Sequence, residues 1–542
     1  MKRTAKPFSM GPTPPSRPEW PEADHPAAQG ELRAGHAGRR LKVFLRERRW
    51  LLAGWLAAML CLLWPALVNS QPLFFYDTIG YLRGAVQAFH VAGLESGWPA
   101  YVNPGAAPEV PAETVAERAQ TDGFISSARS IYYGALLYAG DVLGSFWFTL
   151  LLQALAAGLA IHLTLRALGM GRAETPLVLG ALGILTPLSF YSSYLMPDVF
   201  AGVTILAGAG LLVFFDRLGW RERALYFTLL SVSLMFHASH IAVAVLLGAA
   251  GVVIVRLATK RTPWKGAGAV SAAVAIGLLS QAAFYWTVEA VYGHSPLRPP
   301  FLMARVIDDG PGYDYLKATC PENGFKVCEF LPVLPLGTDA FLWSKDPESG
   351  VIGPADPETR RRLADEQMAF VVEVLRHDFT GQLAASMKGF VQQLSRFAVT
   401  EFRYSDPLRE LVAENLPPRE RTAFRNSLLY RDGFPLAGVS VFHALVIGSS
   451  AAFLIWGLFR LSSRRPAVSG VSEKTARTLT IFCLAVLAGV VANAAVTGIL
   501  SIPHDRYQAR IIWLIPLLAL SVFLCLRKEL RAVPDFARKV QA

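Results

Sequence analysis

The sequence predicts an all-α polytopic membrane protein with about ten transmembrane helices. Of its 542 residues, 53% are hydrophobic and only 17% are charged, whereas soluble domains carry roughly 25% charged residues. Several apolar runs approach or exceed the roughly 20 residues that a helix needs to cross a bilayer. Basic residues flank these runs, so the net charge of +11 is interpreted as a topology signal and not as affinity for nucleic acid.

The chain is predicted to start with a disordered cytoplasmic tail, residues 1–45, which is rich in Pro, Gly, Ala and Arg and has no apolar periodicity. Arg46-Glu-Arg-Arg49 then precedes the first apolar run. A basic cluster in this position favours a cytoplasmic N-terminus. The expected spans cover residues 50–68, 145–165, 176–195, 199–215, the two halves of 224–255, 267–291, 435–459, 479–500 and a last run that ends at Arg527.

The run from Ala224 to Val255 is too long for one ordinary span, and Phe236-His-Ala-Ser-His240 interrupts it. We therefore expect a hairpin of two spans with this motif at its tip. With ten spans, every basic cluster falls on the cytoplasmic side, as the positive-inside rule requires. These clusters are Arg166/Arg172, Arg217/Arg221/Arg223, Lys260/Arg261/Lys265, Arg460/Arg464/Arg465 and Arg527/Lys528.

The resulting layout is that of a bacterial inner-membrane protein with both termini in the cytoplasm and its unusual polar motifs on the periplasmic face. Residues 46–291 form an N-terminal transmembrane core with a first outer loop at 69–144. Residues 292–434 form a periplasmic cap, 435–531 the C-terminal transmembrane helices and 532–542 a cytoplasmic tail. Within the cap, the amphipathic stretch from Phe379 to Val399 is suited to lie along the membrane surface.

Two of the five cysteines, Cys320 and Cys328, occupy one polar loop of the cap. Their spacing is too wide for a zinc knuckle, and no second pair completes four ligands. A disulfide is therefore predicted, because the loop is expected on the oxidising side of the membrane.

Two acidic residues at the outer ends of spans are candidate catalytic groups. Asp77 follows the first span closely, in Pro72-Leu-Phe-Phe-Tyr-Asp77, and Asp198 follows the third span in Met196-Pro-Asp198. A carboxylate beside apolar walls is a suitable general base for activating a hydroxyl or amine. Asp198 has a second interpretation as the N-cap of the fourth span.

Basic and aromatic residues on the same face are candidates for substrate binding. Arg506 and Arg510 lie four apart with Tyr507 between them, which suits bidentate binding of a lipid phosphate or, alternatively, interfacial anchoring. His237 and His240 would share a helical face and could donate to a phosphate or serve as structural histidines. No third ligand is evident, so no metal site is assigned, although a divalent metal is not excluded. Arg129 and Tyr81 belong to the same outer region and are expected to line the cleft.

These motifs resemble the GT-C class of integral-membrane glycosyltransferases, which includes the protein O-mannosyltransferases and the lipid A aminoarabinose transferases. The resemblance lies in Tyr76-Asp77-Thr-Ile-Gly-Tyr81 after the first span, in Met196-Pro-Asp198 at a later outer turn, and in Asp505-Arg-Tyr-Gln-Ala-Arg510 before the last span. The chain departs from the O-mannosyltransferases in lacking a second acid beside Asp77. Its cysteine loop looks like that of bacterial membrane proteins of similar layout that have not been characterised.

The resemblance implies a GT-C-like fold with outer-face surface helices. It also implies transfer of a sugar from a polyprenyl-phosphate-linked donor to an envelope glycolipid, polysaccharide or protein. Asp77 would be the base, and the arginines would hold the lipid phosphate. The membrane lipid, the lipid-linked sugar and the envelope acceptor are then the expected partners, with no nucleic acid. Two alternatives remain: a transporter or flippase of a lipid-linked precursor, for which internal repeats and broken helices would be typical, and a non-catalytic envelope-assembly protein.

Overall fold

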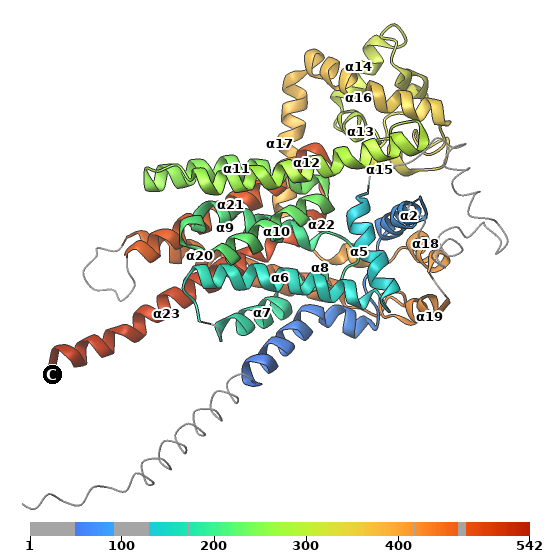
Figure 1. Ribbon diagram of the computed structural model, residues 1–542. Helices are drawn as coiled ribbons and strands as arrows, with labels where there is room; N and C mark the ends of the chain where they lie inside the picture. The colour runs from blue at the N-terminus through green and yellow to red at the C-terminus, as the bar shows by residue number, and fades with distance from the viewer. Residues whose placement is uncertain (1–48, 92–128, 172, 417, 464–472, 542) are drawn as a thin grey trace, which may run out of the picture. The chain divides into compact units, whose positions relative to one another are not determined.

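The computed structural model describes residues 49–91, 129–171, 173–416, 418–463 and 473–541, and within these ranges the chain is helical and forms no strand. The predicted N-terminal tail, 1–45, lies outside them. Met1–Gly54 and Trp55–Ala542 are separate units, and all the packing described below lies within the second unit, whose helices are labelled in Figure 1.

Eight helices in the described ranges are long and apolar enough to cross a membrane, so the protein is a multi-pass membrane protein. Each coincides with one of the expected spans. They are Arg49–Asn69, α6 (Trp147–Ala167), α9 (Val199–Phe214, continued by η1 at Phe215–Arg217), α11 (Ala238–Thr259), α12 (Trp264–Tyr292), α20 (Leu436–Ser462), α21 (Glu473–Leu500) and the pair α22 (Asp505–Ile512) and α23 (Leu514–Gln541).

The other two expected spans are helical but shorter. The segment expected at 176–195 is broken into α7 (Glu174–Leu185) and α8 (Leu188–Ser192). The break occurs because Thr186 is extended and Pro187 lacks the N–H that would continue the helical hydrogen bonds. The segment before the His-Ala-Ser-His motif is α10, Trp220–Phe236, whose 17 residues begin with a charged turn. The predicted break at the motif is confirmed, since α10 and α11 are separated by the single extended residue His237.

Helix α9 is the centre of the membrane part. It packs against α6, α10, α11, α12 and α21, and almost all of its residues are buried. Small residues permit this crowding: a Cβ on Gly202 would lie only 2.4 Å from Cζ2 of Trp513. By contrast, α12 and α20 expose most of their apolar side chains, as expected of helices that face lipid.

The region after α12 contains a second hydrophobic core. It is built from side chains between Met303 and Val374, which come mainly from α13, α14, α15 and α16. The helices are α13 (Phe301–Asp308), α14 (Pro311–Thr319), η2 (Lys326–Val333), α15 (Thr338–Trp343) and α16 (Pro357–His377). We call residues 301–377 the cap; they are the part of the predicted 292–434 region that shares this core. A separate core gives this region a fold of its own beside the spans.

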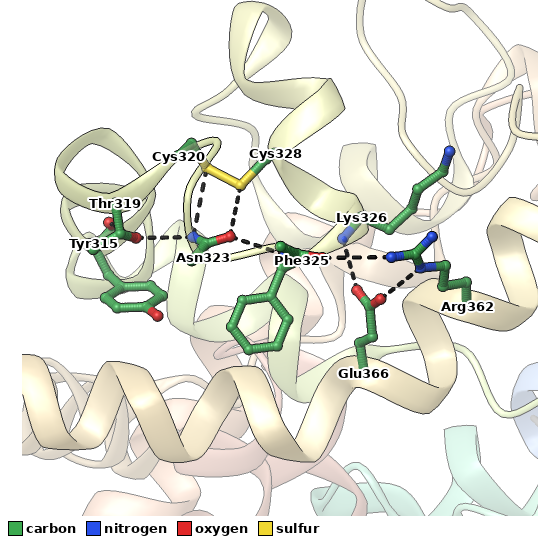
Figure 2. The surroundings of a disulfide bond; sticks show 10 residues. Tyr315, Thr319, Cys320, Asn323, Phe325, Lys326, Cys328, Arg362 and Glu366 are labelled. Atoms are coloured by element: carbon green, nitrogen blue, oxygen red, sulfur yellow. Dashed lines mark hydrogen bonds and ion pairs between the residues drawn. A yellow bond between two sulfur atoms is a disulfide. The ribbon is translucent and has the colours of Figure 1, made fainter.

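The predicted disulfide between Cys320 and Cys328 is confirmed and lies in the cap (Figure 2). Asn323, inside the closed loop, donates from Nδ2 to Thr319 Oγ1 at 2.8 Å and accepts the Phe325 N–H at 2.9 Å. The loop is tied to α16, since Glu366 accepts the Lys326 N–H at 2.7 Å. The disulfide therefore fixes one edge of the cap's core.

Helix α17 (Phe379–Ser395) leads from the cap back to the membrane part. It is followed by η3 (Thr400–Phe402), α18 (Asp406–Asn415) and α19 (Pro418–Asn426). Helix α17 packs on α21, and the two backbones approach where Gly389 faces Gly498. Two glycines are required at this crossing, because a Cβ on Gly389 would lie 2.3 Å from the Gly498 carbonyl oxygen.

Gly389→Leu should therefore separate α17 from α21 and destabilise the fold by about 1–3 kcal/mol, the usual cost of overpacking. The measurement is the thermal unfolding midpoint of the purified protein in detergent. Gly438→Leu is the matched control, since a Cβ on Gly438, also a helical glycine, meets no atom within 4 Å. Equal midpoints for the two variants would contradict the close approach.

Candidate functional site

A short backbone contact at the ends of the spans brings together the two predicted acidic residues. Leu73 pairs with Tyr194: its N–H donates to the Ser193 carbonyl at 2.9 Å, and its own carbonyl accepts the Leu195 N–H at 2.9 Å. Thr78 adds a bond from Oγ1 to the Leu195 carbonyl at 3.1 Å. Asp77, in the first turn of α2 (Tyr76–Val91), is thereby held beside the segment that leads into Asp198.

Asp198 directly precedes α9 but makes no capping hydrogen bond with its side chain. The capping interpretation is therefore wrong for its carboxylate, which instead faces the arginines of α22. Oδ1 of Asp198 lies 3.3 Å from Nη1 of Arg510 and 3.8 Å from Nε of Arg506. The side chains of Asp198 and Arg510 are almost completely buried, at 2% and 1% exposure.

Asp77 joins the same group of charges. Its Oδ1 accepts a hydrogen bond from Arg129 Nη2, and its Oδ2 lies 3.9 Å from Nη1 of Arg506. We call Asp77, Arg129, Asp198, Arg506 and Arg510 the charge cluster. Three guanidinium groups face two carboxylates, an excess of one positive charge.

Two buried nitrogens of the cluster have no hydrogen-bond partner among the described residues, Nη1 of Arg506 and Nε of Arg510. Leaving a buried donor unpaired costs free energy, so the cluster has donor capacity that its own carboxylates do not use. With the excess positive charge, this capacity suits an anionic ligand with several oxygen acceptors.

Aromatic rings form the walls of the cluster. The guanidinium of Arg506 lies 4.5 Å from the ring centre of Phe75 and 5.1 Å from that of Tyr507, within the range of cation–π attraction. Tyr81 is buried and meets Tyr133 edge to face. Burial raises the pKa of Tyr81, the charge of Arg129 lowers it and the charge of Asp77 raises it. The net shift is upward, so Tyr81 is a neutral phenol beside the cluster.

The two histidines lie near the cluster, and Ser239 lies between His237 and Arg510. His237 is extended and not helical, so the expected shared helical face is wrong, although the rings are only 5.2 Å apart. His237 Nδ1 is 2.8 Å from Ser239 Oγ, which in turn lies 3.5 Å from Nη2 of Arg510. His240 donates from Nδ1 to the Ser233 carbonyl at 2.9 Å. His237 therefore contacts the cluster through Ser239, whereas the hydrogen bond of His240 goes to the backbone of α10.

Metal binding finds no support in the described ranges, where no group of three His, Cys, Asp or Glu side chains could hold an ion. A surface hollow lined by Asp406, Arg409, Glu414 and Tyr430 shares no residue with the charge cluster. Three carboxylates and two arginines line it in all, with Glu410 and Arg425. Arg409 is already paired with Asp406 and Asp432, so this hollow is a weaker candidate site for an anion than the cluster.

The sequence analysis missed three residues that position the arginines. Asn493, within span α21, accepts from Arg510 Nη2 at 3.0 Å and donates to the Tyr507 carbonyl at 2.7 Å. Glu401 accepts the N–H groups of Asp505 at 2.8 Å and Arg506 at 3.2 Å. A single Asn within an apolar run indicates a polar contact inside the membrane part, and Asn493 could have been selected from the sequence on this ground. Glu401 has no comparable sequence feature.

The third missed residue is Gln393 of α17, whose side-chain amide holds the backbone of His504. Nε2 donates to the His504 carbonyl at 2.7 Å, and Oε1 accepts the His504 N–H at 2.9 Å. His504 also bridges two acids, with Nδ1 at 3.3 Å from Glu401 and Nε2 at 3.7 Å from Asp339 of the cap. The start of α22 is therefore fixed both by α17 and by the cap.

Comparison with known proteins finds no matching family model, no matching curated protein and no matching solved structure.

Asp198→Asn should destabilise the protein by about 3–5 kcal/mol, because it leaves the buried Arg510 without its carboxylate. The exposed pair of Asp216 and Lys265, 3.7 Å apart, provides the control. Asp216→Asn should cost at most about 1 kcal/mol, as is usual for surface ion pairs. Unfolding of both variants in the same detergent gives the comparison, and similar losses would argue against a buried ion pair.

The fold should lose stability as pH rises from neutral. Burial alone lowers the pKa of His504, but the interactions with the carboxylates of Asp339 and Glu401 outweigh burial and raise the pKa from 6.5 to about 10. Because the folded pKa exceeds the unfolded one, the stabilisation is complete below the unfolded value and is lost as pH rises through the folded value. The thermal unfolding midpoint should decrease as the pH is raised from 7 to 10. His504→Gln should make this decrease with pH smaller. An unchanged slope would contradict the bridge.

Proposed function

We propose that this protein is a GT-C-type membrane glycosyltransferase of the bacterial inner membrane. It transfers a sugar from a polyprenyl-phosphate-linked donor to an envelope glycolipid, polysaccharide or protein acceptor on the periplasmic face. The observation that carries the proposal is the charge cluster at the ends of the spans, with its excess positive charge and its two buried nitrogens that have no hydrogen-bond partner among the described residues.

The cluster matches the demands of a phosphate leaving group. Guanidinium groups bind phosphate oxygens in a fixed planar geometry, and Arg506 and Arg510 are held close together on α22 by Glu401 and Asn493. In a site with little water, such fixed charges stabilise charge that develops in the transition state. Arg506 and Arg510 would therefore hold the donor phosphate.

The two carboxylates differ in exposure, which separates their roles. Asp198 is 2% exposed and lies against both arginines of α22, whereas Asp77 is 17% exposed. A base must reach the proton that it removes. Asp77 is therefore the proposed base, and Asp198 is the residue that positions Arg506 and Arg510.

In the proposed reaction, the acceptor oxygen or nitrogen forms a bond to the anomeric carbon of the sugar. The bond between that carbon and the phosphate oxygen breaks, and its electron pair leaves with the polyprenyl phosphate. The acceptor proton passes to Asp77. Arg506 and Arg510 stabilise the charge that accumulates on the departing phosphate.

One observation favours a second candidate, a transporter or flippase of a lipid-linked precursor. The third expected span is interrupted between α7 and α8 and ends at Asp198, and interrupted helices beside polar groups are typical of transport sites. In such a protein the charge cluster would bind the lipid phosphate without activating an acceptor. Only the enzyme needs Asp77 as a base, so Asp77 distinguishes the two functions.

Asp77→Asn should abolish sugar transfer while leaving the protein in the membrane, since loss of a general base lowers rates by roughly 10²–10⁴-fold. The measurement is mass spectrometry of the glycolipids and envelope polysaccharides of three strains: wild type, deletion and Asp77→Asn. We expect the same hexose, pentose or amino-sugar mass to be missing from both mutants.

Asp406→Asn is the matched control, because Asp406 also pairs with an arginine, Arg409 at 2.9 Å, but lies at the surface. It should resemble wild type, with equal protein levels in all strains that carry the gene. A wild-type glycan profile in Asp77→Asn beside a defect in the deletion would reject the base and favour transport.

A further inference from the structure

Helix α17 exposes large apolar side chains while it buries two glutamines. Its fully buried residues are Gln382, Gly389 and Gln393. Its exposed side includes four large apolar side chains spaced four residues apart, so that they form one stripe. These are Phe379 at 59%, Leu383 at 50%, Met387 at 45% and Val391 at 59% exposure. We call these four residues the α17 stripe.

Three of the four amide atoms of the two buried glutamines of α17 are hydrogen-bonded within the protein, whereas Oε1 of Gln382 has no partner among the described residues. Gln382 donates to Asp309 of the cap at 2.8 Å, and Gln393 holds the backbone of His504 with both amide atoms. The arrangement of polar groups inside and apolar groups outside is favourable where the surroundings are hydrocarbon, since polar groups there must find partners within the protein.

The position of α17 in the fold indicates that lipid covers the α17 stripe. The helix packs on span α21 at Gly498, and Leu500, at the end of that span, is 48% exposed. Helix α17 therefore lies against a spanning helix, and the α17 stripe lies on its other side, because Met387 and Val391 are each two residues from Gly389, about 200° around the helix. Its 17 residues measure about 25 Å at 1.5 Å per residue, which is less than the hydrocarbon core of roughly 30 Å.

Two exposed basic residues fit the same location. Lys388 follows Met387 of the stripe, and Arg396 follows the last helical residue. Long basic side chains at a membrane boundary extend toward lipid phosphates while their aliphatic parts stay in apolar surroundings. Their charge favours an anionic lipid surface.

We propose that α17 is a membrane-embedded helix that does not cross the bilayer, with the α17 stripe inserted among the lipids of the outer leaflet. The lipid surface then supports the helix from which Gln393 holds the start of α22. The proposal depends only on the burial pattern and the packing of α17, and it stands whether or not the protein transfers sugar.

The test uses single cysteines labelled with an environment-sensitive fluorophore in phosphatidylcholine–phosphatidylglycerol vesicles. The probes replace Leu383 and Val391. Leu279→Cys on α12, exposed at 60%, serves as the lipid-facing reference, and Glu348→Cys in the exposed loop after α15 serves as the water-facing reference. The unmodified chain, labelled in parallel, gives the background from Cys61, Cys483 and Cys525, since Cys320 and Cys328 are joined.

We expect nitroxide lipids labelled on the acyl chain to remove fluorescence at positions 383 and 391 as they do at 279, and iodide in the water to have little effect there. Position 348 should show the reverse. Quenching of 383 and 391 by iodide, as at 348, would overturn the proposal. Protection from both quenchers would also overturn it, because a protein surface would then cover the stripe. Each variant must unfold at the same temperature as the parent chain.

Discussion

The buried ion pair between Asp198 and Arg510 is the constraint on which the candidate site depends. It joins the start of α9 to α22 at 3.3 Å with both side chains almost fully buried. Either charge alone would be strongly unfavourable there, so the two segments must stay together. One turn before Arg510, Arg506 is consequently held near both Asp198 and Asp77.

The second constraint is the pairing of Leu73 with Tyr194, which brings a segment after the first span to the segment before α9. The ion pair and this backbone contact act on different parts of the chain, yet both end at the same cluster. Residues from four separate segments are thereby assembled with an excess of positive charge. Such an assembly is suited to a lipid phosphate, and this charge balance is why we favour a phosphate-linked donor.

The cap and α17 also contact the segment that carries the arginines of the cluster. Gln393 and Glu401 hold the backbone from His504 to Arg506, and His504 is shared with Asp339 of the cap. A movement of the cap would therefore change the position of Arg506. In the proposed lipid setting of α17, the lipid surface also contributes to holding this segment in place.

The sequence by itself determined the helical membrane class, the position of each apolar segment, the break at His237, the disulfide, and the polar residues at the ends of the spans. These features follow from hydropathy, length and local spacing, which act along the chain. Tertiary structure alone decided the pairing of Asp198 with Arg510 and the contributions of Asn493, Glu401 and Gln393. These contacts join residues far apart in the sequence, and only the packing of helices in three dimensions selects among the possible partners of a buried charge.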